Sequence, residues 1–241
     1  MATRFQQKTP DLLRRMETKL RSCNPKQHQI NYVFDTWERV FSQDEDLFEI
    51  NRRVGESISR GEVFDFAIEA QADPTCVRRL AMAVMIWGYG KTGYGPTRTS
   101  KMLGHPQAVE RLIEGAEIVR EGDLTDACLF FRSSSRGALN QFGWSFFTKY
   151  FYFVGAVSGL SPMPLILDGS SRDQGVAGGM KRLADAGDAG AARAMELWWS
   201  TADRRCADGY ALYVELVNRW ALDLECRPDA IEMALWEDLV L

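Results

Sequence analysis

Asp168 is the first residue whose setting suggests chemistry. It follows the apolar run at 164–167 and precedes Gly169-Ser170-Ser171. A carboxylate there could stabilise a developing positive charge or activate water, and it could equally cap a helix N-terminus. Taken alone, an aspartate before Gly-Ser-Ser favours the cap. Asp173 is a weaker candidate that fits a solvated helix residue.

Lys149 is the second such residue, because it interrupts the strongly aromatic stretch ALNQFGWSFFTKYFYFVG at 138–155. Its amine could extend past the aromatic surface to a phosphate, or reach a pocket and polarise or attack a substrate. It could also pair with a structural acid. The sequence leaves these three roles open.

The third candidate is Gly88-Tyr89-Gly90-Lys91-Thr92-Gly93, which matches G-x-G-x-x-G. A dinucleotide site needs a strand before the glycines, but VRRLAMAVMIW favours a helix. The Walker pattern fails as well, because Met85 stands where its first glycine should be. We therefore expect a tight connection between two helices, whose backbone N–H groups could still touch phosphates.

The elements that must position these residues are helices. Helical spacing, caps and prolines predict helices at about 10–23, 31–42, 44–59, 61–71, 73–88, 106–120, 123–140 and 170–186, and through most of 189–241. Period-2 alternation is almost absent. The sequence predicts an all-α protein.

A helical hairpin is expected in the aromatic stretch. One helix would end near Asn140, the turn would be 141–144, and the second helix would begin at Ser145. The first-turn N–H groups of that second helix would suit a phosphate. Leu139 and Phe142 would anchor the turn in the core.

The composition and charge of the chain exclude several classes of protein. The chain has 241 residues, 46% hydrophobic and 26% charged, with a net charge of −4. No apolar run is long enough for a membrane span and no signal peptide is evident, so we expect a cytoplasmic protein without membrane contact. The five cysteines form no CxxC pair, which argues against zinc, iron–sulfur or disulfide sites. Residues 129–167 contain no acid, so a phosphate backbone could lie there.

The segment 139–149, LNQFGWSFFTK, resembles the helix-hairpin-helix element of DNA glycosylases, particularly the bacterial branch similar to 8-oxoguanine glycosylase. Pro164-Leu165-Ile166-Leu167-Asp168 resembles the end of the same signature. The resemblance covers about 125–185. It implies a single all-α domain over 1–241, made of two helical lobes with DNA held across the cleft between them.

The resemblance also implies roles for individual residues. Asp168 would be the catalytic carboxylate, and a monovalent cation could be bound by hairpin carbonyls, with no other cofactor. The family has glycines at two alternate hairpin positions, and here the first is Gln141. Bifunctional members carry a Schiff-base lysine where this chain has Ser145, so we expect a monofunctional enzyme. Lys149 lies one helical turn further on.

DNA contacts and a base pocket follow from the same resemblance. The expected DNA-binding residues are Gln141, Phe142, Gly143, Trp144, Ser145, Lys149, Arg132, Arg136 and Lys91. Aromatic side chains in loops or at a turn could stack on a flipped base or fill its place, namely Trp87, Tyr89, Tyr94 and Trp144. We expect three further aromatic residues on helices to lie in the core: Trp198, Trp199 and Tyr210.

The resulting hypothesis is a monomeric DNA glycosylase that acts on double-stranded DNA, excises a flipped modified base and leaves an abasic site. Its substrate would be an oxidised purine, in repair, or a bulky modified phage base such as glucosylated hydroxymethylcytosine, in antiphage defence. The alternatives are a helix-hairpin-helix DNA-binding protein without catalysis and a nucleotide-binding protein that uses 88–93.

Overall fold

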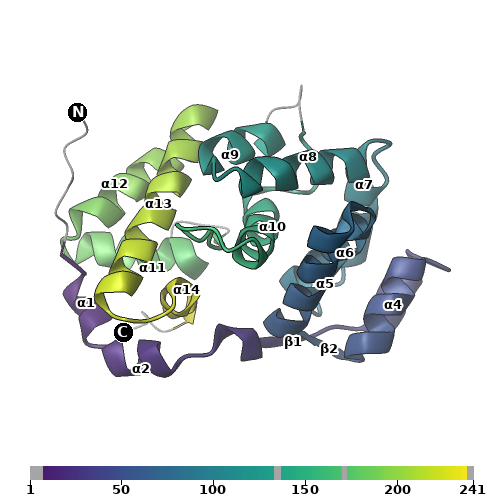
Figure 1. The fold of residues 1–241 in the computed structure, drawn as a ribbon, viewed down its shortest axis with the longest axis horizontal. Coiled ribbons are helices and arrows are strands. Elements are labelled where there is room, and N and C mark those ends of the chain that lie inside the picture. The colour runs from purple at the N-terminus through teal and green to yellow at the C-terminus, as the bar shows by residue number, and fades with distance from the viewer. Residues whose placement is uncertain (1–7, 133–136, 170–172, 238–241) are drawn as a thin grey trace. The chain divides into compact units, whose positions relative to one another are not determined.

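The computed structural model describes residues 8–132, 137–169 and 173–237. Its described residues are mostly helical, and the small sheet β1–β2 contains only three residues in each strand, which confirms the all-α class (Figure 1). The chain divides into two compact units, which are taken separately below. One comprises Asn24–Ile166, and the other comprises Met1–Cys23 with Leu167–Leu241.

The unit Asn24–Ile166 holds the hairpin. Its elements are η1 (Pro25–Gln27), β1 (Gln29–Asn31), α3 (Phe34–Glu38), α4 (Glu45–Val54), β2 (Ser57–Ser59), α5 (Arg60–Ala72), η2 (Pro74–Cys76), α6 (Val77–Tyr89), α7 (Gly95–Leu103), α8 (Ala108–Arg120), α9 (Leu124–Arg132) and α10 (Trp144–Val157).

Helix α10 forms the core of this unit. It packs against α5, α6 and α8, and every residue from 147 to 155 is buried. Phe151 and Phe153 are fully buried, and the Tyr150 hydroxyl donates a hydrogen bond to the Leu112 carbonyl at 2.9 Å. A helix that is apolar on nearly every face must lie inside a protein, which explains the aromatic run.

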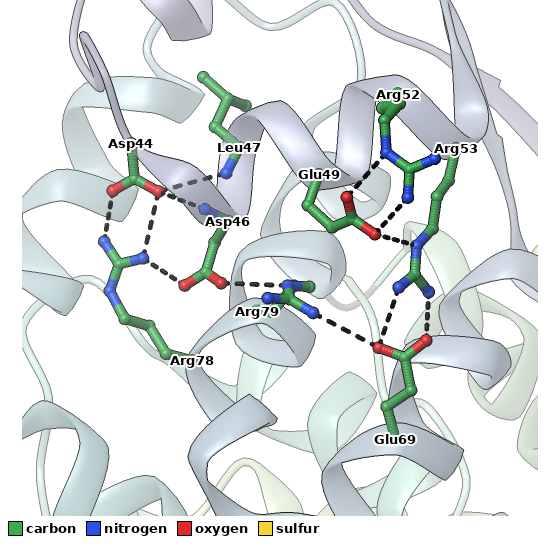
Figure 2. A network of polar contacts seen from close by, with 9 residues as sticks. All are labelled: Asp44, Asp46, Leu47, Glu49, Arg52, Arg53, Glu69, Arg78 and Arg79. Atoms are coloured by element: carbon green, nitrogen blue, oxygen red, sulfur yellow. Dashed lines mark hydrogen bonds and ion pairs between the residues drawn. The ribbon is translucent and has the colours of Figure 1, made fainter.

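An ion-pair network joins α4 to α5 and α6 (Figure 2). Asp44 caps α4 and, together with Asp46, binds the guanidinium of Arg78 on α6. Arg79 pairs with Asp46 and with Glu69 of α5. On the exposed side, Glu69 binds Arg53, and Glu49 binds Arg52 and Arg53. Each arginine of the network therefore pairs with at least one carboxylate.

The second unit contains α1 (Asp11–Arg14), α2 (Glu17–Ser22), α11 (Gly175–Asp185), α12 (Ala189–Trp198), α13 (Asp203–Asp223) and α14 (Pro228–Glu237). Helix α12 packs on α13, and α11 packs on both α12 and α14. Gly179 permits the close approach of α14, because a Cβ there would lie 2.3 Å from the Leu235 carbonyl oxygen.

Several predicted helix bounds were wrong. The expected helix at 44–59 ends at Val54, where Gly55 takes a φ of +66°, and Ser57–Ser59 then pairs antiparallel with Gln29–Asn31. Within the expected helix at 31–42, only Phe34–Glu38 is α-helical. The predicted helix at 10–23 consists of α1 and α2.

The helix before the hairpin also ends earlier than predicted. Helix α9 runs to Arg132, and 137–143 is not helical. The Gly137 N–H donates to the Phe130 carbonyl at 3.0 Å, and a Cβ at Gly137 would lie 2.0 Å from the Phe130 ring. The chain thus folds back against α9, and only glycine fits at this position.

No described helix is both long enough and apolar enough to cross a membrane.

Candidate functional site

The hairpin turn leads directly into α10. Trp144 is the first residue of the helix, one residue earlier than predicted, and Gly143 is its N-cap. The Gly143 carbonyl accepts hydrogen bonds from the N–H groups of Phe146 and Phe147 at 2.8 and 3.0 Å. No side chain among the described residues caps this N-terminus. As the N-cap residue, Gly143 therefore offers no side-chain acceptor to offset the partial positive charge of the helix.

Gln141 has the backbone conformation of a glycine. Its φ is +67°, in the left-handed region that favours glycine. This is the position where the resembling hairpins carry their first glycine. The chain therefore adopts a glycine-like backbone conformation here with an L side chain, at a cost of about 1–2 kcal/mol.

Gly143 has room for a side chain. Its φ of −80° is accessible to any residue, and within the described part of the chain no atom lies within 4 Å of a Cβ built there. Packing within the described chain therefore does not require glycine at 143. Close approach of an external group to the backbone would require it.

A cavity of about 620 Å³ opens beside the turn. Its described lining combines aromatic, amide and guanidinium side chains, from Tyr89, Arg98, Phe131, Arg132, Leu139, Asn140, Gln141, Phe142, Gly143, Trp144, Ser145, Phe146 and Phe147. We call it the hairpin pocket. Its described lining contains no Asp or Glu, so its electrostatic character is positive.

Both arginines of the hairpin pocket lie against aromatic rings. The Arg132 guanidinium is 5.2 Å from the Trp144 ring centroid, and that of Arg98 is 4.2 Å from the Tyr94 centroid. Such cation–π contacts orient a guanidinium without neutralising it.

The anchors of the turn are buried as expected. Leu139 is 5% exposed and Phe142 is 2% exposed. The ring of Phe142 contacts those of Phe131 and Tyr150, with centroids 5.2 and 6.0 Å away. The turn is thereby fixed to the core of its unit.

Lys149 is buried, with 3% of its surface exposed. Its Nζ donates a hydrogen bond to the Ser145 carbonyl at 2.9 Å and lies 5.5 Å from the Phe146 ring centroid. The amine thus folds back by one turn to the residue at which the resembling enzymes carry their lysine.

Two of the predicted aromatic residues are placed differently from our expectation. Trp87 and Tyr89 lie in α6, not in a loop, and are only 5% and 8% exposed. The sequence of α6 favours helix strongly enough to carry it through Gly88 to Tyr89. Tyr94, at the start of α7, is 53% exposed, and Trp144 is half-buried at the hairpin tip. Trp198 and Tyr210 are buried and Trp199 is half-buried, as fits core residues.

Of the other predicted DNA contacts, Arg132 lines the hairpin pocket. Lys91 is exposed in the connection between α6 and α7 and is not part of the pocket lining. Arg136 lies outside the described residues.

Asp168 belongs to the second unit, where its backbone is held against α11. Its carbonyl accepts a hydrogen bond from the Ala177 N–H at 3.2 Å, and a Cβ at Gly175 would lie 2.7 Å from the same oxygen. The side chain is half-buried. The N-cap position of α11 is Gln174, which makes no side-chain capping hydrogen bond. Asp173 is exposed and lies 3.9 Å from Lys181.

His28 offers little for acid–base chemistry near neutral pH. Burial and the neighbouring Arg60 charge lower the pKa of His28 to about 4, which makes its imidazole neutral. The Nδ1 atom of His105 accepts a hydrogen bond from the Gln107 N–H at 3.1 Å. In the described ranges, no three His, Cys, Asp or Glu side chains gather as a metal site.

Comparison with protein families shows to which family the chain belongs. The family model described as "Putative 8-oxoguanine DNA glycosylase OGG-like protein" matches residues 24–236. The chain belongs to this family. Membership confirms the resemblance of the hairpin segment and makes the chain a DNA glycosylase at this coarse level, with DNA as its partner. No curated protein and no solved structure gives a significant match.

Arg98 is the charged pocket residue that the sequence analysis did not predict. It lies four residues after Tyr94 on α7, a spacing at which helical side chains meet. That spacing was the only signal in the sequence, and it does not indicate that α7 lies beside the hairpin.

Proposed function

We propose that this protein is a monofunctional DNA glycosylase that hydrolyses the N-glycosidic bond of a modified base flipped from double-stranded DNA. The product would be an abasic site. The hairpin pocket carries the proposal, since it joins an uncapped α10 N-terminus to arginines and has no carboxylate in its described lining. Family membership supports the reaction class.

The hairpin would hold a DNA phosphate. The first-turn N–H groups of α10 carry the positive end of the helix dipole, and backbone N–H groups at a helix N-terminus bind phosphate oxygens well. The free space at Gly143 would let the DNA backbone approach the turn closely. Trp144 at the hairpin tip and exposed Tyr94 are our candidates for stacking on bases or filling the space of the flipped nucleotide.

Asp168 would carry the chemistry. Cleavage of an N-glycosidic bond develops positive charge on the sugar, as glycoside hydrolysis does, and a nearby carboxylate stabilises that charge and can activate water. The carbonyl of Asp168 is fixed against α11, so its backbone is held in place. Gln174, not Asp168, occupies the N-cap position of α11.

Lys149 would not act as a Schiff-base nucleophile. Its amine donates to the Ser145 carbonyl and is buried, so it is held within its own helix. We assign it a supporting role, as a positive charge near the first turn of α10 that strengthens the attraction for phosphate. This role is why we propose hydrolysis without strand cleavage.

The substrate is either an oxidised purine or a bulky modified base such as glucosylated hydroxymethylcytosine. The first would make the enzyme a repair protein and the second an antiphage protein. We expect a monomer that needs no cofactor beyond a monovalent cation held by hairpin carbonyls.

The test is base release from duplexes that carry each substrate class, with unmodified DNA as control, followed by alkali to cut abasic sites. We expect cleavage after alkali with one modified duplex and at least a hundredfold loss in Asp168→Asn, from the loss of a charge-stabilising group. Asp173→Asn is the matched control, because this exposed carboxylate lies five residues away.

Two outcomes would overturn the proposal. Full activity in Asp168→Asn would remove the carboxylate from the mechanism. Salt-dependent DNA binding without base release from any duplex would favour a DNA-binding protein without catalysis.

A further inference from the structure

The glycine-rich segment between α6 and α7 allows close packing of α6, α7 and α10. A Cβ at Gly88 would lie 2.7 Å from the Phe146 ring, and one at Gly95 would lie 2.8 Å from the Tyr89 side chain. Gly90 has a φ of +54°. These glycines let α6 approach α10 closely and let α7 begin directly on Tyr89.

Tyr89 connects the hairpin helix to α7. Its ring lies 4.3 Å from that of Phe146 on α10 and 5.6 Å from that of Tyr94, measured between centroids. The Arg98 guanidinium lies close enough to the Tyr89 hydroxyl to affect its pKa. Burial raises the pKa of Tyr89 and the Arg98 charge opposes this rise, so the phenol stays neutral near pH 7. Arg98 is therefore positioned relative to α10 by a chain of aromatic contacts.

Arg98 remains a net positive charge at this place. Its side chain is exposed, its guanidinium lies against Tyr94, and no carboxylate of the described residues forms an ion pair with it. It lines the hairpin pocket together with the first turn of α10. A guanidinium that is fixed but not neutralised suits an anionic group from another molecule.

We propose that Arg98 is a second DNA-backbone contact, which binds a phosphate beside the one at the α10 N-terminus. This inference rests on the proposed function, because it takes DNA as the occupant of the hairpin pocket. Tyr94 and Tyr89 pre-position the guanidinium, so little side-chain entropy is lost on binding. The glycine-rich segment thus serves DNA binding through the helix it positions, and not as a nucleotide loop.

The expected effect is specific to a phosphate contact. Each phosphate neutralised by an arginine adds about 0.9 to the slope of log K against log salt on duplex DNA. Arg98→Ala should therefore lower that slope by about 1 and weaken binding about tenfold at low salt, equally for modified and unmodified duplexes.

The experiment measures duplex binding by fluorescence anisotropy between about 50 and 200 mM salt, the range in which such contacts are resolved. The proteins are the wild type, Arg98→Ala, Arg98→Lys and Lys101→Ala. Lys101 is the matched control, because it is an exposed cation on α7 outside the pocket lining. Arg98→Lys should keep most of the slope but bind more weakly, since it loses the planar fork.

The results separate this inference from the function on which it rests. An unchanged slope in Arg98→Ala, or an equal loss in Lys101→Ala, overturns the Arg98 contact while DNA binding by the wild type stands. Absence of DNA binding by the wild type overturns both. Thermal unfolding of each variant confirms that the exposed substitutions leave the fold intact.

Discussion

Two groups of arginines in the unit Asn24–Ile166 differ in their interaction partners. In the α4–α5–α6 network, Arg78 and Arg79 each meet carboxylates, and Glu69 and Glu49 complete the pairing (Figure 2). In the hairpin pocket, Arg98 and Arg132 lie against aromatic rings, and the described lining contains no Asp or Glu.

The difference distinguishes arginines that stabilise the fold from arginines that can bind an external group. A partly buried guanidinium must be paired if it is to stabilise the fold, because desolvation otherwise costs more than it gains. Arg98, which Tyr94 orients and which forms no ion pair with a carboxylate of the described residues, keeps a charge that can attract an external anion. Substitution of a network arginine should therefore change stability and leave DNA binding unchanged, and substitution of Arg98 should change DNA binding and leave stability unchanged.

The largest expected effect is on stability. Arg78→Met removes the shared partner of Asp44 and Asp46, whose side chains are only 15% and 17% exposed, and should cost about 3 kcal/mol of unfolding free energy. Chemical denaturation measures this cost. DNA affinity of the folded variant should equal that of the wild type, and a loss of affinity would break the division between the two regions.

Gly143→Ala should act on binding. The added methyl fits the free protein but occupies the space that the DNA backbone needs, so affinity should fall about tenfold or more. Because alanine is a poorer N-cap than glycine, stability should fall by up to about 1 kcal/mol. Anisotropy titration and thermal unfolding check both effects. Unchanged affinity would mean that DNA does not approach Gly143.

Gln141→Gly should stabilise the turn. It relieves a left-handed backbone conformation, with an expected net gain of about 1 kcal/mol after the extra chain entropy of glycine. Denaturant midpoints measure the gain. Equal or lower stability would show that the Gln141 side chain compensates for its backbone, for instance through its hydrogen bond to Asn140.

The smallest effect concerns pH. Burial raises the pKa of Asp44, but Arg78 and the N–H groups of Leu47 and Asp46 outweigh it, and the net pKa lies below 3.8. A lowered folded-state pKa gives stability that is complete above the unfolded pKa and lost as pH falls through the folded one. The stability of Asp44→Asn should therefore depend less on pH below about 4 than that of the wild type. Parallel curves in acid denaturation would contradict this.

The sequence predicted the second helix of the hairpin well because the signals for that helix are local. The aromatic run requires burial, and Gly143 followed by that run places the start of α10 within one residue. The strands at 29–31 and 57–59 were missed because three residues are too short to show a period. The end of α9 was missed because the role of Gly137 depends on contact with Phe130.

The candidate site was predictable only in part. The hairpin residues and Asp168 were named from the resemblance, and their roles stay predictions. The structure shows that Leu139 and Phe142 anchor the turn in the core and that the Asp168 carbonyl bonds to α11. Arg98 was missed because its position depends on tertiary packing through Gly88, Gly95 and Tyr89. The same packing buries Tyr89, which a glycine-rich sequence had suggested would be in an open loop.

The central claim is base excision without an amine nucleophile, and one divided reaction tests it most directly. Wild-type protein and a modified duplex are incubated together, and samples are then left untreated, heated in alkali, or reduced with borohydride. We predict strand cleavage only after alkali and no trapped covalent adduct. Cleavage without alkali, together with an adduct that disappears in Lys149→Ala, would contradict the account and make Lys149 the nucleophile.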